Sequence, residues 1–113
     1  MIILVCGGRD FINQQKFNDA MDMLNFVPDM VVQGGARGAD RLGRLWAKNN
    51  KIHFAEVPAL WDAFGKSAGP ERNSAMLLLN IDYCIAFPGG YCTANMVKKC
   101  RASGITTWLP YGV

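Results

Sequence analysis

The sequence has few of the side chains that usually build metal sites. It contains a single histidine, His53, and no C-x-x-C pair, so the usual zinc motifs are missing. We therefore expect neither a metal ion nor a cofactor. Its four cysteines predict free thiols, which are typical of a reducing cytoplasmic compartment: Cys6, Cys84, Cys92 and Cys100.

Long apolar runs and an excess of charge are also missing. The opening apolar run, residues 1–6, is too short for a signal peptide or a membrane span. Lys plus Arg number 12 and Asp plus Glu number 9, a net charge of +3, which falls short of a duplex-DNA binder. The basic cluster Lys98, Lys99 and Arg101 lacks the interleaved aromatic residues of single-strand binders. We predict a cytoplasmic protein without membrane contact, and nucleic acid is not the expected partner.

Strand and helix patterns alternate along the 113 residues. Short apolar runs predict strands at 2–6, 30–33, 52–57, 82–87 and 105–109. Helical spacing predicts helices at 13–26, after Gly38 with Leu42, Leu45 and Trp46 on one face, at 71–79 and at 93–103. Residues 58–70 indicate an irregular connection of about one helical turn, with Pro70 opening the next helix. The alternation predicts one α/β domain over 1–113, a three-layer α/β/α Rossmann-like fold with a mainly parallel sheet of about five strands.

Glycine gathers after three of the predicted strands, in G-G-R-D at 7–10, G-G-A-R-G-A-D at 34–40 and P-G-G-Y-C-T at 88–93. Parallel sheets bind ligands beyond the carboxyl ends of their strands, where the strand order reverses. Glycine lets backbone N–H groups approach an anion, and the first turn of a helix adds free donors. A tight turn explains any one loop equally well, but three at one sheet edge favour a phosphate-binding site. The fingerprints of ATPases and dehydrogenases are absent.

Several charged and aromatic residues lie in or beside these loops. Arg9, Arg37 and Arg72 are the arginines placed to hold a phosphate, although a single arginine is more often a solvated surface charge. Asp40 either pairs within its loop or accepts hydrogen bonds from ribose hydroxyls, and both alternatives stay open. Trp61 is able to stack on a base, but packing at the core edge is the more common role.

The combination of G-G-R-D-F, G-G-A-R-G-A-D-R-L, Trp61, G-P-E-R-N at 69–73 and P-G-G with T-A-N-M-V at 93–97 resembles the YspA-type, YpsA-related branch of the SLOG superfamily. The resemblance covers almost the whole chain. It implies a Rossmann-like domain that binds a nucleotide or nucleotide-derived ligand, with residues 34–40 and 89–93 as its phosphate and sugar cradle. Relatives include cytokinin-activating phosphoribohydrolases and a DNA-processing protein. The expected ligand residues are Gly7, Gly8, Arg9, Gly34, Gly35, Ala36, Arg37, Gly38, Asp40, Arg72, Asn73, Gly89, Gly90 and Thr93.

Two departures from the family pattern affect the expected chemistry. Cys92 replaces a glycine of P-G-G-x-G-T, so a side chain occupies space that a phosphate would otherwise approach. Asn95 stands where the phosphoribohydrolases have a catalytic glutamate, and an amide cannot transfer the proton. Glu71 is then the remaining candidate for a catalytic carboxylate.

Three functions follow as hypotheses. The first is binding or sensing of a small nucleotide-derived ligand at the glycine loops. The second is an enzyme that hydrolyses an N-glycosidic bond in such a ligand, and the third is single-stranded nucleic-acid binding. A homo-oligomer is compatible with so small a domain, although no feature of the sequence specifies its symmetry.

Overall fold

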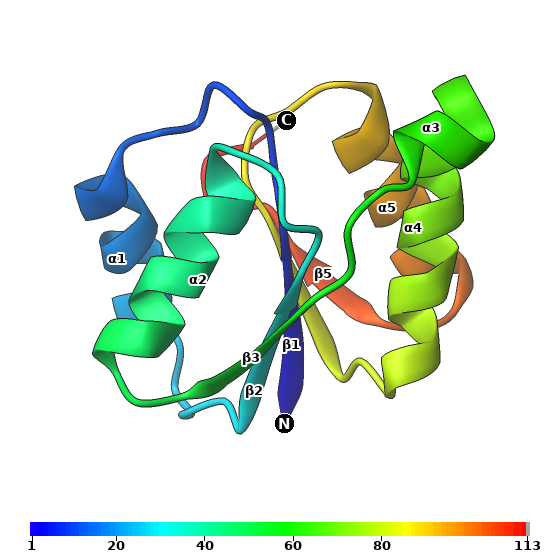
Figure 1. Ribbon diagram of the computed structural model, residues 1–113. Coiled ribbons are helices and arrows are strands. Elements are labelled where there is room, and N and C mark those ends of the chain that lie inside the picture. The colour runs from blue at the N-terminus through cyan, green and yellow to red at the C-terminus, as the bar shows by residue number, and fades with distance from the viewer. Residues whose placement is uncertain (113) are drawn as a thin grey trace.

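Five short segments pair as parallel strands in the computed structural model, which describes residues 1–112 (Figure 1). The sheet has the order β3-β2-β1-β4-β5. This arrangement confirms the predicted α/β fold with a parallel sheet. The strands are β1 (Ile2–Cys6), β2 (Met30–Gln33), β3 (His53–Glu56), β4 (Tyr83–Ala86) and β5 (Thr106–Trp108).

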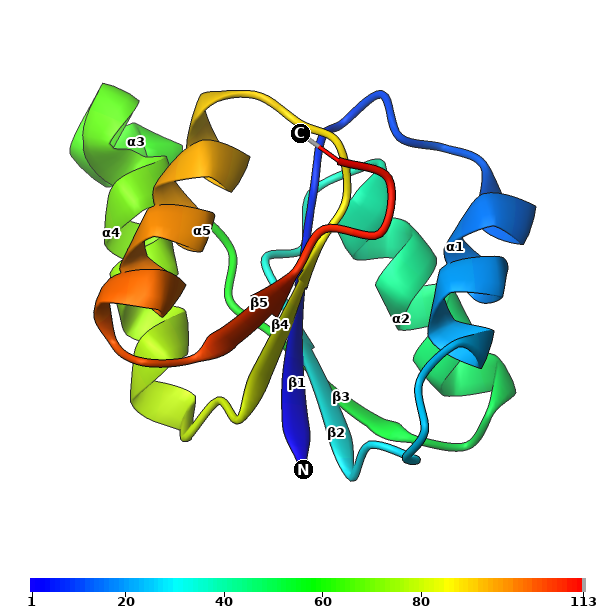
Figure 2. The same cartoon turned by 180° about the vertical axis from the view of Figure 1, so that it is seen from behind.

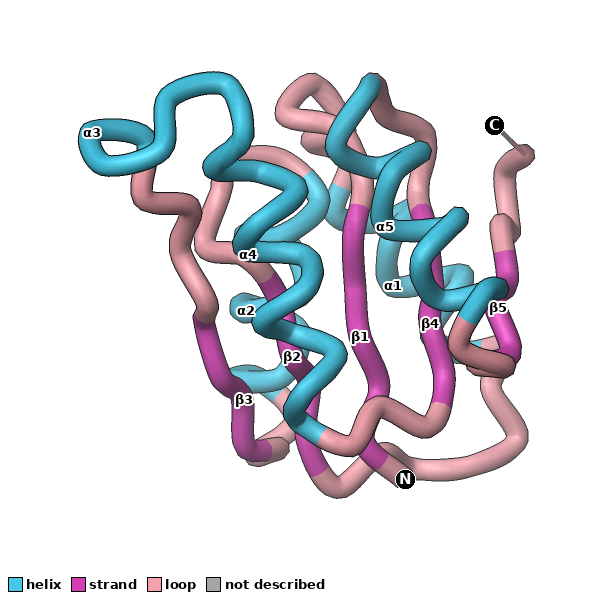
Figure 3. Tube along the Cα trace, turned by 90° about the vertical axis from the view of Figure 1, so that its right-hand side faces the viewer, coloured by secondary structure: helices cyan, strands magenta, loops and turns pink. Residues whose placement is uncertain are grey.

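The order of the strands reverses beside the central strand β1. From β1 the chain builds outward through β2 to β3, and it then crosses to the other side of β1 for β4 and β5. Figure 3 shows β1 running between β2 and β4. The loops that leave β1 and β4 therefore lead to opposite faces of the sheet, and such a point is where α/β sheets form a ligand crevice.

Helices cover both faces of the sheet (Figures 1 and 2). The helices α1 (Gln14–Asp22) and α2 (Ala39–Asn49) lie on one face, while α4 (Ala68–Met76) and α5 (Tyr91–Ala102) lie on the other. Alternate residues of β1 serve the two cores, so Val5 packs toward α1 and α2 and Leu4 packs toward α4 and α5. A strand buried on both faces requires a continuous apolar run, as residues 2–6 provide.

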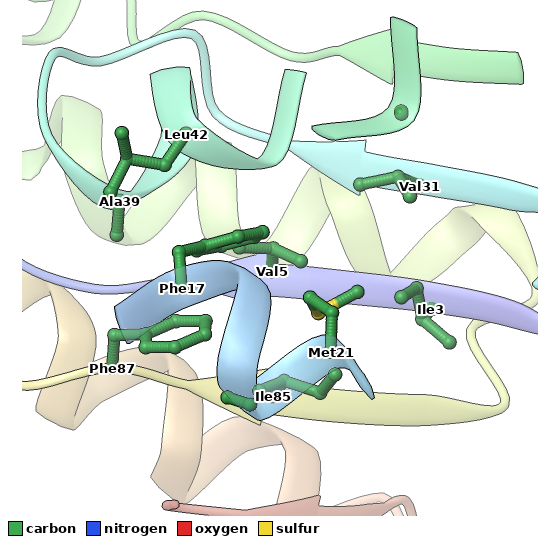
Figure 4. Packing of buried hydrophobic residues seen from close by; sticks show 11 residues of the cluster. Ile3, Val5, Phe17, Met21, Val31, Ala39, Leu42, Ile85 and Phe87 are labelled. Carbon is green, nitrogen blue, oxygen red and sulfur yellow. The ribbon is translucent and has the colours of Figure 1, made fainter. Parts of the chain in front are cut away.

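Aromatic packing connects the core on the α1 and α2 face of the sheet to the loop after β4. The rings of Phe17 on α1 and Phe87 stack with their centroids 4.6 Å apart, and both side chains are buried (Figure 4). Phe11, in the loop after β1, also contacts Phe87, with a centroid distance of 4.9 Å. These rings fix the loops after β1 and β4 relative to α1.

The first two helices differ from the prediction. The first ends at Asp22 rather than residue 26. On α2 the predicted apolar face is only partly buried, because Leu45 is exposed and Trp46 half-buried. The helix lies so close to β1 that a Cβ on Gly43 would stand 3.2 Å from Val5 Cγ1, so small residues face the sheet.

The segment 58–70 is more helical than predicted. It contains α3 (Trp61–Phe64) and the 3₁₀ turn η1 (Gly65–Ser67), and α4 already begins at Ala68. Pro70 is therefore the third residue of α4 rather than the first, still within the turn whose N–H groups have no helical partner. The helix ends at Met76, and a second 3₁₀ turn, η2 (Leu77–Leu79), leads toward β4.

Candidate functional site

The loops after β1, β2 and β4 meet at one end of the sheet (Figure 1). With α3 and α4 they line a cleft of about 840 Å³. This volume is in the range of small-molecule sites. Gly38 lies outside the lining, and the exposed side chain of Glu71 on α4 also lies outside it. The predicted ligand residues that line the cleft are Gly7, Gly8, Arg9, Gly34, Gly35, Ala36, Arg37, Asp40, Arg72, Asn73, Gly89, Gly90 and Thr93.

The cleft also contains residues for which the sequence suggested no role. Met76 of α4 and Tyr91 of α5 line it, as do Pro58 and Ala59 ahead of α3. Residues 58–59 directly follow the strand predicted at 52–57. This was the one feature of the sequence that placed them in the cleft, because their loop begins at the same sheet edge as the others.

Two glycines of these loops, Gly8 and Gly38, are required by neighbouring backbone. The N–H of Gly8 donates to the carbonyl oxygen of Pro88 at 2.8 Å, and a Cβ on Gly8 would stand 2.8 Å from that oxygen. Gly38 has a φ of +81°, and a Cβ there would overlap the carbonyl oxygen of Gly8 and the backbone of Arg9. A Cβ on Gly90, in contrast, would meet no atom within 4 Å. Glycine at 8 and 38 thus lets the loops pack on one another, whereas Gly90 faces open space.

The loop at 34–38 uses much of its hydrogen-bonding capacity within the protein. The N–H of Gly35 donates to the Oε1 of Gln33, and the N–H of Ala36 donates to the Oδ2 of Asp40 at 3.2 Å. The first residue of α2, Ala39, donates its N–H to the carbonyl oxygen of Gly8 at 3.1 Å. With the N–H of Ala39 engaged and the carboxyl group of Asp40 in its first turn, α2 is less suited to a phosphate than a helix with neither feature.

The N-terminus of α5 is arranged differently. Its N-cap residue, Gly90, supplies no side-chain cap, and its first turn carries no acidic residue. Within residues 1–112, the N–H groups of Tyr91, Cys92 and Thr93 have no hydrogen-bond acceptor. Free N–H groups and the positive end of the helix dipole make this turn the part of the cleft best suited to an anion.

A hydrogen-bond network fixes Arg72 in the wall of the cleft. Its Nη1 donates to the carbonyl oxygen of Gly34 at 3.1 Å, and its Nε donates to the Oδ1 of Asn73 at 3.1 Å. Asn73 is buried, and its Nδ2 donates to the carbonyl oxygen of Cys92 at 2.9 Å and to the Oδ1 of Asn95 at 3.1 Å. The amide of Asn73 is thereby engaged on both sides, so this residue positions Arg72 and α5.

Asp40 is a buried carboxyl in this cleft, 6% exposed. Burial raises its pKa from 3.8 to about 6, against the opposing effects of the Ala36 N–H group and the positive charge of Arg72. Glu56 raises the pKa further through its negative charge. A carboxyl group that titrates near pH 6 in a cleft is able to donate as well as accept a proton.

Cys92 and Trp61 meet above a glycine of α4. A Cβ on Gly69 would overlap the Sγ of Cys92 and stand 3.5 Å from the Cη2 of Trp61. The glycine at 69 thus makes room for the Cys92 thiol, and the Cys92 side chain packs between α4 and α5. The guanidinium carbon of Arg9 lies 5.8 Å from the ring centroid of Trp61.

Other potential sites have little support. Across residues 1–112, no group of three or more His, Cys, Asp or Glu side chains gathers in a way that would hold a metal ion. In the basic cluster on α5, the Nζ of Lys99 donates to the carbonyl oxygen of Pro70 at 2.8 Å and to the Oγ of Ser74 at 2.5 Å. No helix among the same residues is long and apolar enough to cross a bilayer.

Together, the all-parallel sheet, its two helical layers and the glycine-lined cleft at the strand switch define a Rossmann-like α/β protein. The chain belongs to the YspA, cpYpsA-related SLOG family, whose model matches residues 1–64. It is also similar to the Gene 61 protein of Mycobacterium phage D29, with 34% identity over 113 aligned residues that cover 91% of this chain and 90% of that protein.

The contacts of Gly38 predict a large cost for a side chain at this position. Gly38→Ala should lower the free energy of unfolding by about 2–5 kcal/mol. Alanine is strained at a φ of +81°, and its methyl group would also overlap the backbone of Gly8 and Arg9. Gly90→Ala is the matched control and should change it by less than about 1 kcal/mol. Urea unfolding followed by circular dichroism measures both, and equal losses would contradict the proposed loop packing.

The raised pKa of Asp40 predicts a pH-dependent contribution to stability. Folding favours the protonated carboxyl, so the stabilisation is complete below about pH 4 and is lost as the pH rises through about 6. Relative to Asp40→Asn, the free energy of unfolding of the wild-type protein should fall by on the order of 3 kcal/mol across this pH window. Urea unfolding of both proteins at a series of pH values checks this expectation. Parallel pH profiles would show that Asp40 titrates normally.

Proposed function

We propose that the cleft binds a nucleotide-derived ligand, with its phosphate at the N-terminal turn of α5. The observation that carries this proposal is the set of free N–H groups at Tyr91, Cys92 and Thr93, which face no acceptor within residues 1–112. A bound phosphate would accept from them and benefit from the helix dipole. Membership of the SLOG family is consistent with a nucleotide-related role.

The charges of the cleft suit a small anion. Arg9, Arg37 and Arg72 line it together with Asp10 and Asp40, which leaves one net positive charge when both aspartates are ionised. The guanidinium of Arg72 is already oriented by two hydrogen bonds and retains further N–H groups for a ligand. A long polyanion would require a continuous basic surface. These features support a small anionic ligand over single-stranded nucleic acid.

We include in the proposal the homo-oligomer with which the sequence is compatible. Leu60 and Phe64 are exposed together at α3, beside the cleft. Clustered exposed apolar side chains are typical of surfaces that take part in association.

Binding is tested by thermal unfolding with AMP, ADP-ribose and NAD. At a concentration of about 100 times the Kd, a ligand should add about 2.7 kcal/mol of stability and raise the melting temperature. Arg37→Ala and Arg72→Lys should weaken binding about tenfold, because each removes a charged hydrogen-bond donor fork. Arg101→Ala, in the last turn of α5, should leave affinity unchanged. No stabilisation by any of the three compounds would argue strongly against the proposal.

Hydrolysis of an N-glycosidic bond is the second candidate, favoured by Asp40. Its carboxyl lines the cleft and titrates near pH 6, whereas Glu71, the carboxylate indicated by the sequence, is exposed outside the lining. If Asp40 transfers the proton, release of adenine from AMP should fall by at least about 100-fold in Asp40→Asn. It should persist in Glu71→Gln.

Chromatography of the reaction products separates the outcomes. Loss of adenine release in Glu71→Gln alone would return the catalytic role to Glu71. If the wild-type protein releases no base from AMP, ADP-ribose or NAD, hydrolysis of this kind is excluded for these substrates and binding remains.

A further inference from the structure

The indole of Trp61 stands in the wall of the cleft with a face available for stacking. Its side chain is 42% exposed although it lies at the N-terminus of a helix that packs on α4. The far edge of the ring is held above Gly69, where the Cη2 atom stands 3.5 Å from the position of a Cβ. Anchoring at the edge leaves the faces of the ring to other groups.

A planar group of the protein already lies over this ring. The guanidinium carbon of Arg9 is 5.8 Å from the ring centroid, and both residues line the cleft. Arg9 comes from the loop after β1 and Trp61 from α3, so the contact bridges the cleft between the two. Among residues 1–112, the side chain of Arg9 makes no hydrogen bond or ion pair. The guanidinium is therefore free to leave the ring.

A base competes well for the position of the guanidinium. An exposed cation–π contact favours association by roughly 2- to 5-fold, whereas a base stacked on an aromatic ring contributes roughly 5- to 150-fold. Replacing the Arg9 guanidinium on the indole by a base is therefore favourable. The exchange also leaves the positive charge of Arg9 free next to the ligand.

The stacking face lies next to the proposed phosphate position. Trp61 Cη2 and Cys92 Sγ both approach the same point above Gly69, and Cys92 is the second residue of α5. Its N–H is one of the free donors of that helix turn. The two subsites are thus within reach of the two ends of one nucleoside monophosphate.

We propose that Trp61 is the base-stacking residue of the cleft and that the ligand carries its base, as a nucleoside 5′-phosphate does and a sugar phosphate does not. The base takes the place of the Arg9 guanidinium on the indole while the phosphate binds the first turn of α5. This inference rests on the proposed function and narrows its ligand class.

Calorimetric titration with AMP and with ribose 5-phosphate tests this assignment. The wild-type protein should bind AMP at least about tenfold more tightly than ribose 5-phosphate. In Trp61→Ala the two affinities should become equal through loss of AMP binding alone, and Trp61→Phe should keep part of the preference. Trp108→Phe on β5 is the matched control and should leave the preference intact.

The outcomes separate this inference from the function on which it rests. Retained ribose 5-phosphate binding in Trp61→Ala shows that the phosphate subsite has stayed folded. Equal affinities in the wild-type protein, an unchanged preference in Trp61→Ala, or loss of both ligands in that variant would overturn the stacking role. Binding of neither compound by the wild-type protein would overturn the stacking role, and the thermal unfolding with ADP-ribose and NAD would then decide separately whether the proposed function holds.

Discussion

The backbone of Gly8 lies between two other loops, and the geometry of the cleft depends on this contact. Its N–H donates to Pro88, and its carbonyl oxygen accepts from Ala39 at the start of α2. A Cβ at Gly8 or Gly38 would push these segments apart. The loops after β1, β2 and β4 therefore form one interlocked unit at the point where the strand order reverses.

This contact also makes the first turn of α2 less suited to an anion than that of α5. By accepting from Ala39, the Gly8 carbonyl satisfies one of the first donors of α2, and Asp40 accepts from the loop ahead of that helix. The α5 helix begins after a glycine without a side-chain cap and keeps its first N–H groups open. Two helices that begin after similar glycine-rich sequences therefore differ in their capacity to bind phosphate.

The sequence predicted the fold because its strongest patterns are local. The apolar run of β1 and the alternation of strands and helices indicate a parallel sheet, and the glycine-rich segments mark the loops at its carboxyl edge. The buried face of α2 was predicted only in part, because the close approach of Gly43 to Val5 is a tertiary contact that helical spacing does not encode. The helical content of 58–70 was underestimated because two glycines and two prolines interrupt the local pattern.

For the site, the residue types were easier to predict than their roles. Asn73 and Arg72 were expected as ligand residues, but the network that uses the Asn73 amide joins residues far apart in sequence. The close packing of the Cys92 thiol on Gly69 is another contact between residues far apart in sequence, and it exists only because α4 packs against α5. Pairwise fit between distant elements cannot be deduced from one sequence without knowledge of the fold.

The charge of Arg72 couples anion binding in the cleft to protonation of Asp40. The charge of Arg72 lowers the pKa of Asp40, which burial holds near 6. An anion bound near Arg72 offsets part of that positive charge, and its own negative charge disfavours the ionised carboxyl. Protonation of Asp40 in turn removes a negative charge from the cleft and favours the anion. By linkage the two effects are equal, so the buried carboxyl makes anion binding in the proposed site stronger on the acidic side of neutrality.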